Sequence, residues 1–153
     1  MSILVLALLI GVVAGLRALT APAAVAWAAH LGWLPLGDTW LAFLGYTVTP
    51  YLLSVAAIAE LIADQLPQTG SRKAPGPFAF RIVVGALCGA ALGEAGGMLI
   101  GGAAAGAVGA VIGALAGYEA RIRLAAAVGR DLPIALLEDA IAIVGAIWIV
   151  ASV

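Results

Sequence analysis

The sequence predicts an all-α, polytopic membrane protein in a single domain, residues 1–153. We expect about five transmembrane helices, a short re-entrant or interfacial helix and a glycine-rich helical hairpin. Of the 153 residues, 65% are hydrophobic and 10% are charged, whereas charged residues make up roughly 25% of a typical soluble domain. The mean hydropathy is +1.19. Apolar runs of about 20 residues, the length of a membrane-crossing helix, recur along the chain.

The expected spans are bounded by residues that begin or end helices. Proline suits the first turn of a helix but cannot continue one, so Pro22 closes the first apolar run and Pro133 opens the last. The apolar run at the start has no basic segment before it, so we expect a retained span and not a cleaved signal peptide. The five expected spans are 2–19, 48–66, 78–94, 98–118 and 132–153.

The segments between these spans differ in character. Residues 22–34 are apolar but too short for a bilayer crossing, which predicts a re-entrant or interfacial helix. Residues 67–77 (PQTGSRKAPGP) have the composition of a loop. The hairpin turn is expected at 95–97, with 101–102 as the alternative, and residues 119–131 form a charged helical extension.

The basic residues predict the orientation. Six of the seven Lys and Arg residues lie around 67–77 or within 119–131, and cytoplasmic loops carry an excess of such residues. Both segments are therefore expected in the cytoplasm. If residues 22–34 do not cross the membrane, the N-terminus is cytoplasmic and the C-terminus lies outside.

Composition also excludes several partners. A net charge of −1 gives no basic surface for nucleic acid. One cysteine, Cys88, and one histidine, His30, cannot form a zinc site of the Cys/His type within one chain, nor an intramolecular disulfide. No cofactor is predicted, and the lipid bilayer is the expected surrounding.

Glycines recur at spacings of three and four residues along the predicted hairpin. Small residues at such spacings let helix backbones approach closely in lipid. The stripe is expected to pack the two hairpin helices together; a homodimer interface and a glycine-lined pore are the alternatives. The residues assigned to packing are Gly85, Gly89, Gly93, Gly106, Gly109, Gly113 and Gly117.

Charged residues fall inside or at the edge of the predicted spans, where ionisable groups are costly, paired and often functional. Glu60 lies about 9 Å inside its span, and the others are expected at a similar depth near the cytoplasm. They predict a polar cavity open to the cytoplasm for an ion, small solute or lipid headgroup. A network of interhelical salt bridges and a catalytic site are the alternatives. The candidate site residues are Glu60, Asp64, Arg72, Arg81, Arg121, Glu138, Asp139 and Arg17.

Arg17 is the exception among these residues. It is expected near the outer end of the first span, with Asp38 as the sole obvious acidic partner, where its long side chain can reach outward to water. If residues 22–34 dip back into the membrane, Arg17 instead faces a cavity beside the start of that helix, where an anion is favoured.

Four segments together resemble a known family: 15–34, 60–87, 117–129 and 132–143. They carry a Gly-x-Arg-x-Leu-Thr motif, a Glu-x-x-x-Asp-x-x-Pro-x-Thr motif and a Leu-Glu-Asp-Ala motif. The chain resembles the small bacterial membrane proteins catalogued as domain of unknown function 4126. The resemblance implies a multi-pass protein of the bacterial inner membrane and implies no activity. The matching residues are Gly15, Arg17, Leu19, Thr20, Glu60, Asp64, Pro67, Thr69, Leu137, Glu138, Asp139 and Ala140.

Three functions are consistent with these features. The first is a small transporter or channel-like protein that uses the buried charges. The second is an enzyme acting on lipid phosphate, with paired carboxylates holding Mg²⁺ and Arg72 and Arg81 binding phosphate. The sequence has no phosphate-binding loop or nucleophile motif that favours it. The third is a non-catalytic scaffold or assembly subunit.

Overall fold

The computed structural model describes residues 1–63 and 75–153, and every regular element in these two ranges is helical. The elements are α1 (Ile3–Leu16), α2 (Thr20–His30), the 3-10 helix η1 (Trp40–Gly45), α3 (Thr49–Ala63), α4 (Pro75–Ala95), α5 (Leu99–Val128) and α6 (Leu132–Ala151). Three of the described helices, α4 from Gly76 onward, α5 and α6, are long and apolar enough to cross a membrane. α1 and α3 are apolar but shorter.

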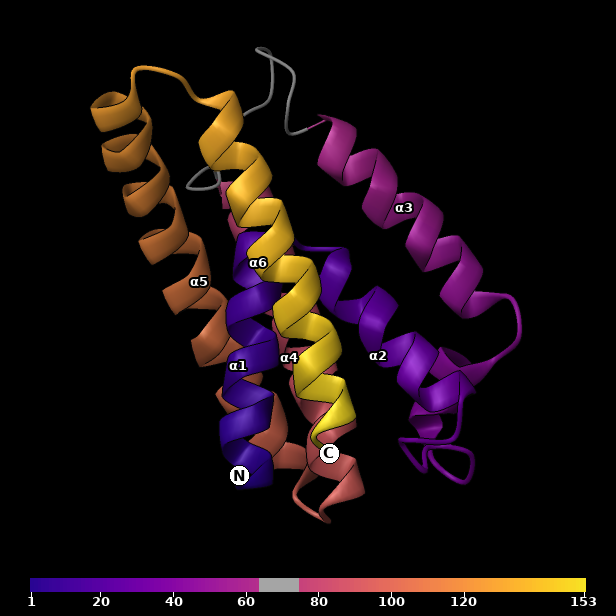
Figure 1. The fold of residues 1–153 in the computed structure, drawn as a ribbon. Coiled ribbons are helices and arrows are strands. Elements are labelled where there is room, and N and C mark those ends of the chain that lie inside the picture. Colours follow the sequence, from indigo (N-terminus) through magenta and orange to yellow (C-terminus); the bar gives the residue numbers. More distant parts are fainter. Residues whose placement is uncertain (64–74) are drawn as a thin grey trace.

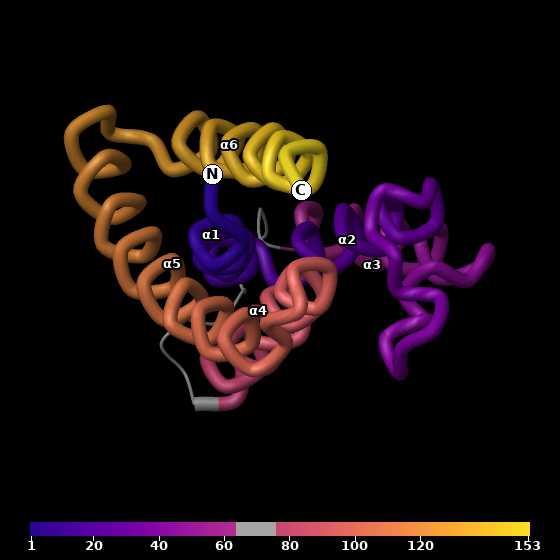
Figure 2. The backbone as a smooth tube through the Cα atoms, turned by 90° about the horizontal axis from the view of Figure 1, so that it is seen from below, coloured from indigo at the N-terminus to yellow at the C-terminus, as the bar shows by residue number. Residues whose placement is uncertain are grey.

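The helices run back and forth along one direction (Figure 1). α1 leads away from the N-terminus, and α2 turns the chain back toward the same end. α3 runs away again, α4 returns, and α5 and α6 form a further hairpin, so that both termini lie at one end. Seen along the bundle, α1 lies inside an arc formed by α4, α5 and α6, all of which it contacts (Figure 2). Opposite ends for the two termini are expected only if residues 22–34 do not cross; α2 runs back along the bundle, so that condition is not met.

The first helix ends earlier than expected. Ser2 caps its start by accepting a hydrogen bond from the Val5 N–H at 3.3 Å. The helix stops at Leu16, not Leu19, and Arg17 has an extended backbone (φ −139°, ψ 108°). α2 then begins at Thr20 and keeps Pro22 in its first turn, where the missing N–H of proline has no helical partner to lose.

The other elements follow the predicted pattern closely. The hairpin turns at Gly96 and Gly97, and Gly97 adopts a positive φ of +70°. α5 continues from the predicted span into the charged extension as one helix, which ends at Gly129 with φ +82°. The predicted loop at 67–77 lies mostly outside the described residues.

The glycines bring three helices into backbone contact. On α5, the faces of Gly102 and Gly106 meet Gly85, Gly89 and Gly93 of α4 so closely that an added Cβ would overlap backbone atoms. A neighbouring face of α5, with Gly109 and Gly113, meets the backbone of α1 at Leu8 and Val12 in the same way. Gly117 continues this helix one turn beyond Gly113. The stripe is thus occupied within the chain and joins α1, α4 and α5.

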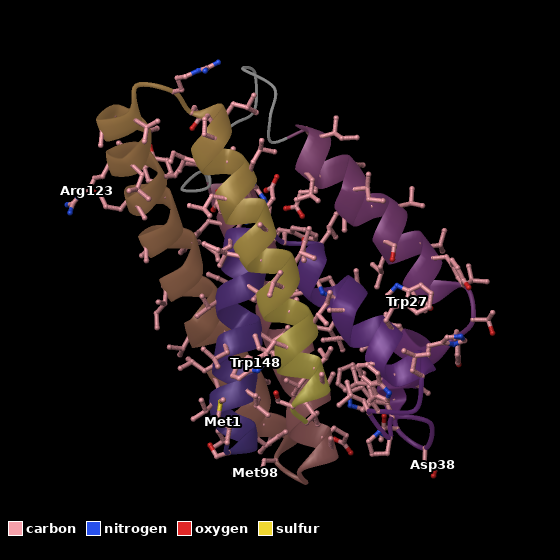
Figure 3. All side chains as sticks on the ribbon, viewed as in Figure 1. Met1, Trp27, Asp38, Met98, Arg123 and Trp148 are labelled. Carbon is pink, nitrogen blue, oxygen red and sulfur yellow. The ribbon has the colours of Figure 1, made fainter. Side chains whose placement is uncertain are left out.

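Many large apolar side chains remain on the outer surface. Val55 on α3, Ile100 on α5 and Val144 on α6 are all more than half exposed. In Figure 3 the sides of the helices carry mainly carbon, whereas Arg123 and Asp38 lie toward opposite ends of the bundle. A surface of this kind is expected where the helices are surrounded by hydrocarbon instead of water.

Candidate functional site

The candidate site is built around the break between α1 and α2. At this break, residues 17–19, the backbone leaves the helical path, so several of its polar groups need partners from elsewhere. The N–H groups of Ala18 and Leu19 each donate a 2.8 Å hydrogen bond to the Glu60 carboxylate, one to each oxygen. The Gly15 carbonyl accepts a 2.8 Å hydrogen bond from Arg81 Nη1. Side chains of α3 and α4 therefore stabilise the break.

Glu60 and Arg81 also face each other. Arg81 Nη2 lies 3.7 Å from Glu60 Oε1, and Arg81 is 6% exposed. The Glu60 carboxylate is thus surrounded by two backbone donors and one guanidinium. These are the groups that proteins use to bind anions, and charge makes such hydrogen bonds short and strong.

Arg17 projects from the break toward α6 and is fully buried, with 0% exposure. Its Nε donates to Asp139 Oδ1 at 2.6 Å, and its Nη2 contacts the same oxygen. Nη2 also lies 3.6 Å from Glu138 Oε2. Because a lone guanidinium in a low-dielectric interior is very costly, these two carboxylates are what permit its burial.

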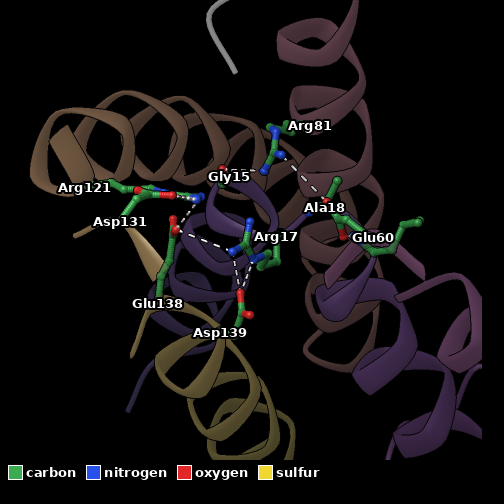
Figure 4. Close-up of polar contacts among 10 residues, drawn as sticks. Gly15, Arg17, Ala18, Glu60, Arg81, Arg121, Asp131, Glu138 and Asp139 are labelled. Atoms are coloured by element: carbon green, nitrogen blue, oxygen red, sulfur yellow. Dashed lines mark hydrogen bonds and ion pairs between the residues drawn. The ribbon is translucent and has the colours of Figure 1, made fainter. Parts of the chain in front are cut away.

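A third arginine extends this network toward the end of the bundle. Arg121 of α5 forms a bidentate ion pair with Asp131, at 2.8 and 3.0 Å, and its Nη1 lies 3.5 Å from Glu138 Oε2. Figure 4 shows the resulting chain of contacts. We call this set the break cluster: Arg17, Glu60, Arg81, Arg121, Asp131, Glu138 and Asp139.

Apart from Asp131, which directly precedes α6, the members of the break cluster lie at similar depth. At 1.5 Å per residue, Asp139 lies about 10 Å into α6 and Arg81 about 9 Å into α4. Both depths are measured from the end of the bundle at which α4 and α6 begin. Asp131 is largely exposed, so the buried part pairs three guanidiniums with three carboxylates among the described residues. The buried part is therefore close to electrically neutral.

The structure brings six of the eight candidate residues together: Arg17, Glu60, Arg81, Arg121, Glu138 and Asp139. Asp64 and Arg72 lie outside the described residues. Their side chains form two groups of ion pairs, as in the salt-bridge alternative: Arg17 and Arg121 with Glu138 and Asp139, and Arg81 with Glu60. The backbone around the break joins the two groups. In the two described ranges, no group of three or more His, Cys, Asp or Glu side chains is arranged to hold a metal ion.

The expected position of Arg17 is wrong. Asp38 was the anticipated partner, but Arg17 pairs with Asp139, because the chain reverses directly after Arg17 and leaves it deep in the bundle. Asp131 and the backbone donors at Ala18 and Leu19 were not among the predicted site residues. An arginine between two apolar segments, followed by a threonine and a proline, was the signal for such a break.

No family model, no curated protein and no solved structure matches this chain. The resemblance to the bacterial membrane-protein family therefore stays a prediction.

Proposed function

We propose that this chain is a small multi-pass membrane transporter or channel-like protein that binds a small anion at the break cluster. The observation that carries the proposal is the position of the Glu60 carboxylate, which rests on two backbone N–H groups of a broken helix beside buried Arg81. Interrupted helices whose exposed backbone groups bind an ion are a recurrent feature of transporters.

In this proposal Glu60 occupies the anion site as a tethered anion. Its carboxylate belongs to α3, whereas the donors that hold it belong to the α1–α2 break and to α4. A rotation of the Glu60 side chain away from the break leaves those donors available for a free anion of similar size.

The charges around the site support an anion over a cation. Each buried carboxylate of the break cluster faces at least one guanidinium. A cation entering the cluster would meet carboxylates that are already neutralised, and it would be repelled by Arg17 and Arg81. An anion that displaces Glu60 meets donors already in place.

The proposed orientation follows from the basic residues. Arg123, and the turn between α5 and α6 that contains Arg130, lie toward the end of the bundle opposite the termini (Figures 1 and 3), and we place this end in the bacterial cytoplasm. Both termini then lie outside. α4, α5 and α6 span the membrane, and α1 and α2 form a hairpin that enters from the outer side and turns at the break cluster.

Anion flux from proteoliposomes tests the function. Vesicles loaded with chloride, nitrate, formate or acetate should release at least one of these faster with the protein than without it. Arg81→Gln should abolish this flux, and Glu60→Ala should raise it. The control Arg123→Gln alters an exposed ion pair with Glu119 and should leave flux unchanged.

Two outcomes would contradict the proposal. Flux equal to that of empty vesicles for all four anions would exclude it. Wild-type flux in both Glu60→Ala and Arg81→Gln would show that the break cluster is not the site. Metal-dependent turnover of a labelled phospholipid would favour the lipid-phosphate enzyme, and recovery within a larger complex without flux would favour the scaffold.

A further inference from the structure

Next to the break cluster lies a cavity of about 230 Å³ between α2, α3 and α6. Its lining runs from Thr20 to Trp27 on α2, from Ser54 to Leu61 on α3 and from Ile143 to Ile147 on α6, and is almost entirely apolar. Apolar cavities of comparable size stay dry and take up hydrocarbon molecules. The cavity therefore suits an apolar occupant.

The shape of the cavity restricts that occupant further. On both α2 and α3 the lining residues span eight positions, or seven steps of 1.5 Å, which corresponds to a length of about 10 Å. An apolar cavity of about 230 Å³ and this length can hold a segment of a hydrocarbon chain.

The two ends of the cavity differ. At the end near Ser54, the hydroxyl oxygen of that residue accepts a 2.9 Å hydrogen bond from Trp27 Nε1. At the other end, Thr20 is 7% exposed, and its Oγ1 has no hydrogen-bond partner among the described residues. A buried hydroxyl without a partner is costly. An occupant that places an acceptor atom beside Thr20 removes that cost.

The side walls connect the cavity to the outer surface. Ile58 of α3 and Ile147 of α6 both line it and are both more than half exposed. In the membrane that the helix lengths indicate, these side chains face lipid. A lipid chain can therefore enter sideways between α3 and α6 without crossing a polar region.

We infer that this cavity binds one acyl chain of a membrane phospholipid, with the ester carbonyl accepting a hydrogen bond from Thr20 Oγ1. An ester suits the Thr20 end of the cavity better than a carboxylate does, because the ester is uncharged. None of the described residues that line the cavity is basic, so the carboxylate of a free fatty acid would be buried there without a charged partner. This lipid site is separate from the proposed anion site and does not depend on transport.

Photocrosslinking of the full-length chain in vesicles tests the inference. The probe is a phosphatidylcholine with a diazirine in the middle of one acyl chain, and the adducts are located by mass spectrometry. We expect adducts to concentrate on Ile58, Ile143 and Ile147 relative to Val108, an exposed residue of α5 outside the cavity. An even distribution over these positions would overturn the inference.

Two variants and a control sharpen the test. Ala24→Phe places a ring in the cavity from the partly buried wall of α2 and should remove most of the cavity adducts. Thr20→Val keeps the volume but removes the hydroxyl, and should lower phospholipid occupancy about fivefold, the effect of one neutral hydrogen bond. Ala104→Phe, on the exposed face of α5, should leave the cavity adducts unchanged.

Competition identifies the lipid. Excess unlabelled phosphatidylcholine should suppress the cavity adducts, whereas palmitic acid at the same concentration should not. Suppression by palmitic acid alone would exclude the phospholipid. Cavity adducts that persist in Ala24→Phe protein with wild-type helical content would place the lipid elsewhere. If that variant fails to fold, the wild-type distribution and Thr20→Val still decide the matter. Anion flux, measured on the same samples, reports independently on the break cluster.

Discussion

Replacing Gly106 with alanine tests whether the contact between α4 and α5 depends on the absence of a side chain. An added Cβ would overlap the carbonyl oxygen of Gly85 and lie 2.9 Å from Gly89 Cα. Carbon atoms pack at about 3.5 to 4.0 Å, so the two helices must separate by about 1 Å. Both obstacles are backbone atoms, which cannot rotate away.

The expected loss of stability is about 2 kcal/mol. Forcing one additional carbon into a well-packed contact costs about 1 to 3 kcal/mol, and separation of α5 from α4 also disturbs its contact with α1. Alanine favours the helical backbone over glycine by about 0.5 to 1 kcal/mol, which offsets part of the cost.

Gly145 of α6 provides the matched control. A Cβ at this position would have Val13 Cγ2, at 3.8 Å, as its nearest neighbour, which is an ordinary contact. Gly145→Ala should therefore leave stability unchanged or raise it by up to about 1 kcal/mol. Unfolding of both variants in mixed micelles with increasing SDS, followed by circular dichroism, measures the difference. Equal stability of Gly106→Ala and Gly145→Ala would refute the reasoning.

Three further predictions concern single contacts, each measured by the same unfolding assay. Asp139→Asn should lower stability by about 3 to 5 kcal/mol because it leaves the buried charge of Arg17 without its nearest carboxylate. Adding Arg17→Gln in the same chain should recover part of that loss. Losses of stability that simply add in the double variant would argue against the ion pair. Arg123→Ala should change stability by less than about 0.5 kcal/mol, because its pair with Glu119 is exposed, and a loss above 1 kcal/mol would contradict this. Gly129→Ala should cost about 1 kcal/mol because φ is +82° at this helix end, so a neutral result would indicate a different local backbone.

The sequence was sufficient to predict the helices and the proximity of most of their buried charged side chains. Long apolar runs bounded by prolines and glycines gave the positions of α4, α5 and α6 to within a few residues, apart from the charged end of α5, which belongs to the same helix. Glu60, Arg81 and Glu138 could be assigned to one depth by counting residues from the expected helix ends. These inferences depend on local composition and spacing alone.

The break at residues 17–19 could not be predicted in the same way. Its conformation depends on Glu60 and Arg81, which lie more than 40 residues away in sequence and bind its backbone groups. Because local sequence does not reveal that contact, the first helix was expected to continue to Leu19. Arg17 was therefore expected apart from Glu138 and Asp139, whereas the reversal of the chain at the break brings the three side chains into contact.

The ion pair between Arg17 and Asp139 has a consequence for biogenesis. The two residues are separated by 122 positions, so the ribosome completes α1 long before it makes α6. Until then the guanidinium of Arg17 lacks the carboxylate that offsets its burial, and a charged group in hydrocarbon is expensive. In the proposed arrangement, in which α1 and α2 turn inside the membrane, we therefore expect the first two helices to take their final position only after the last helix has been inserted.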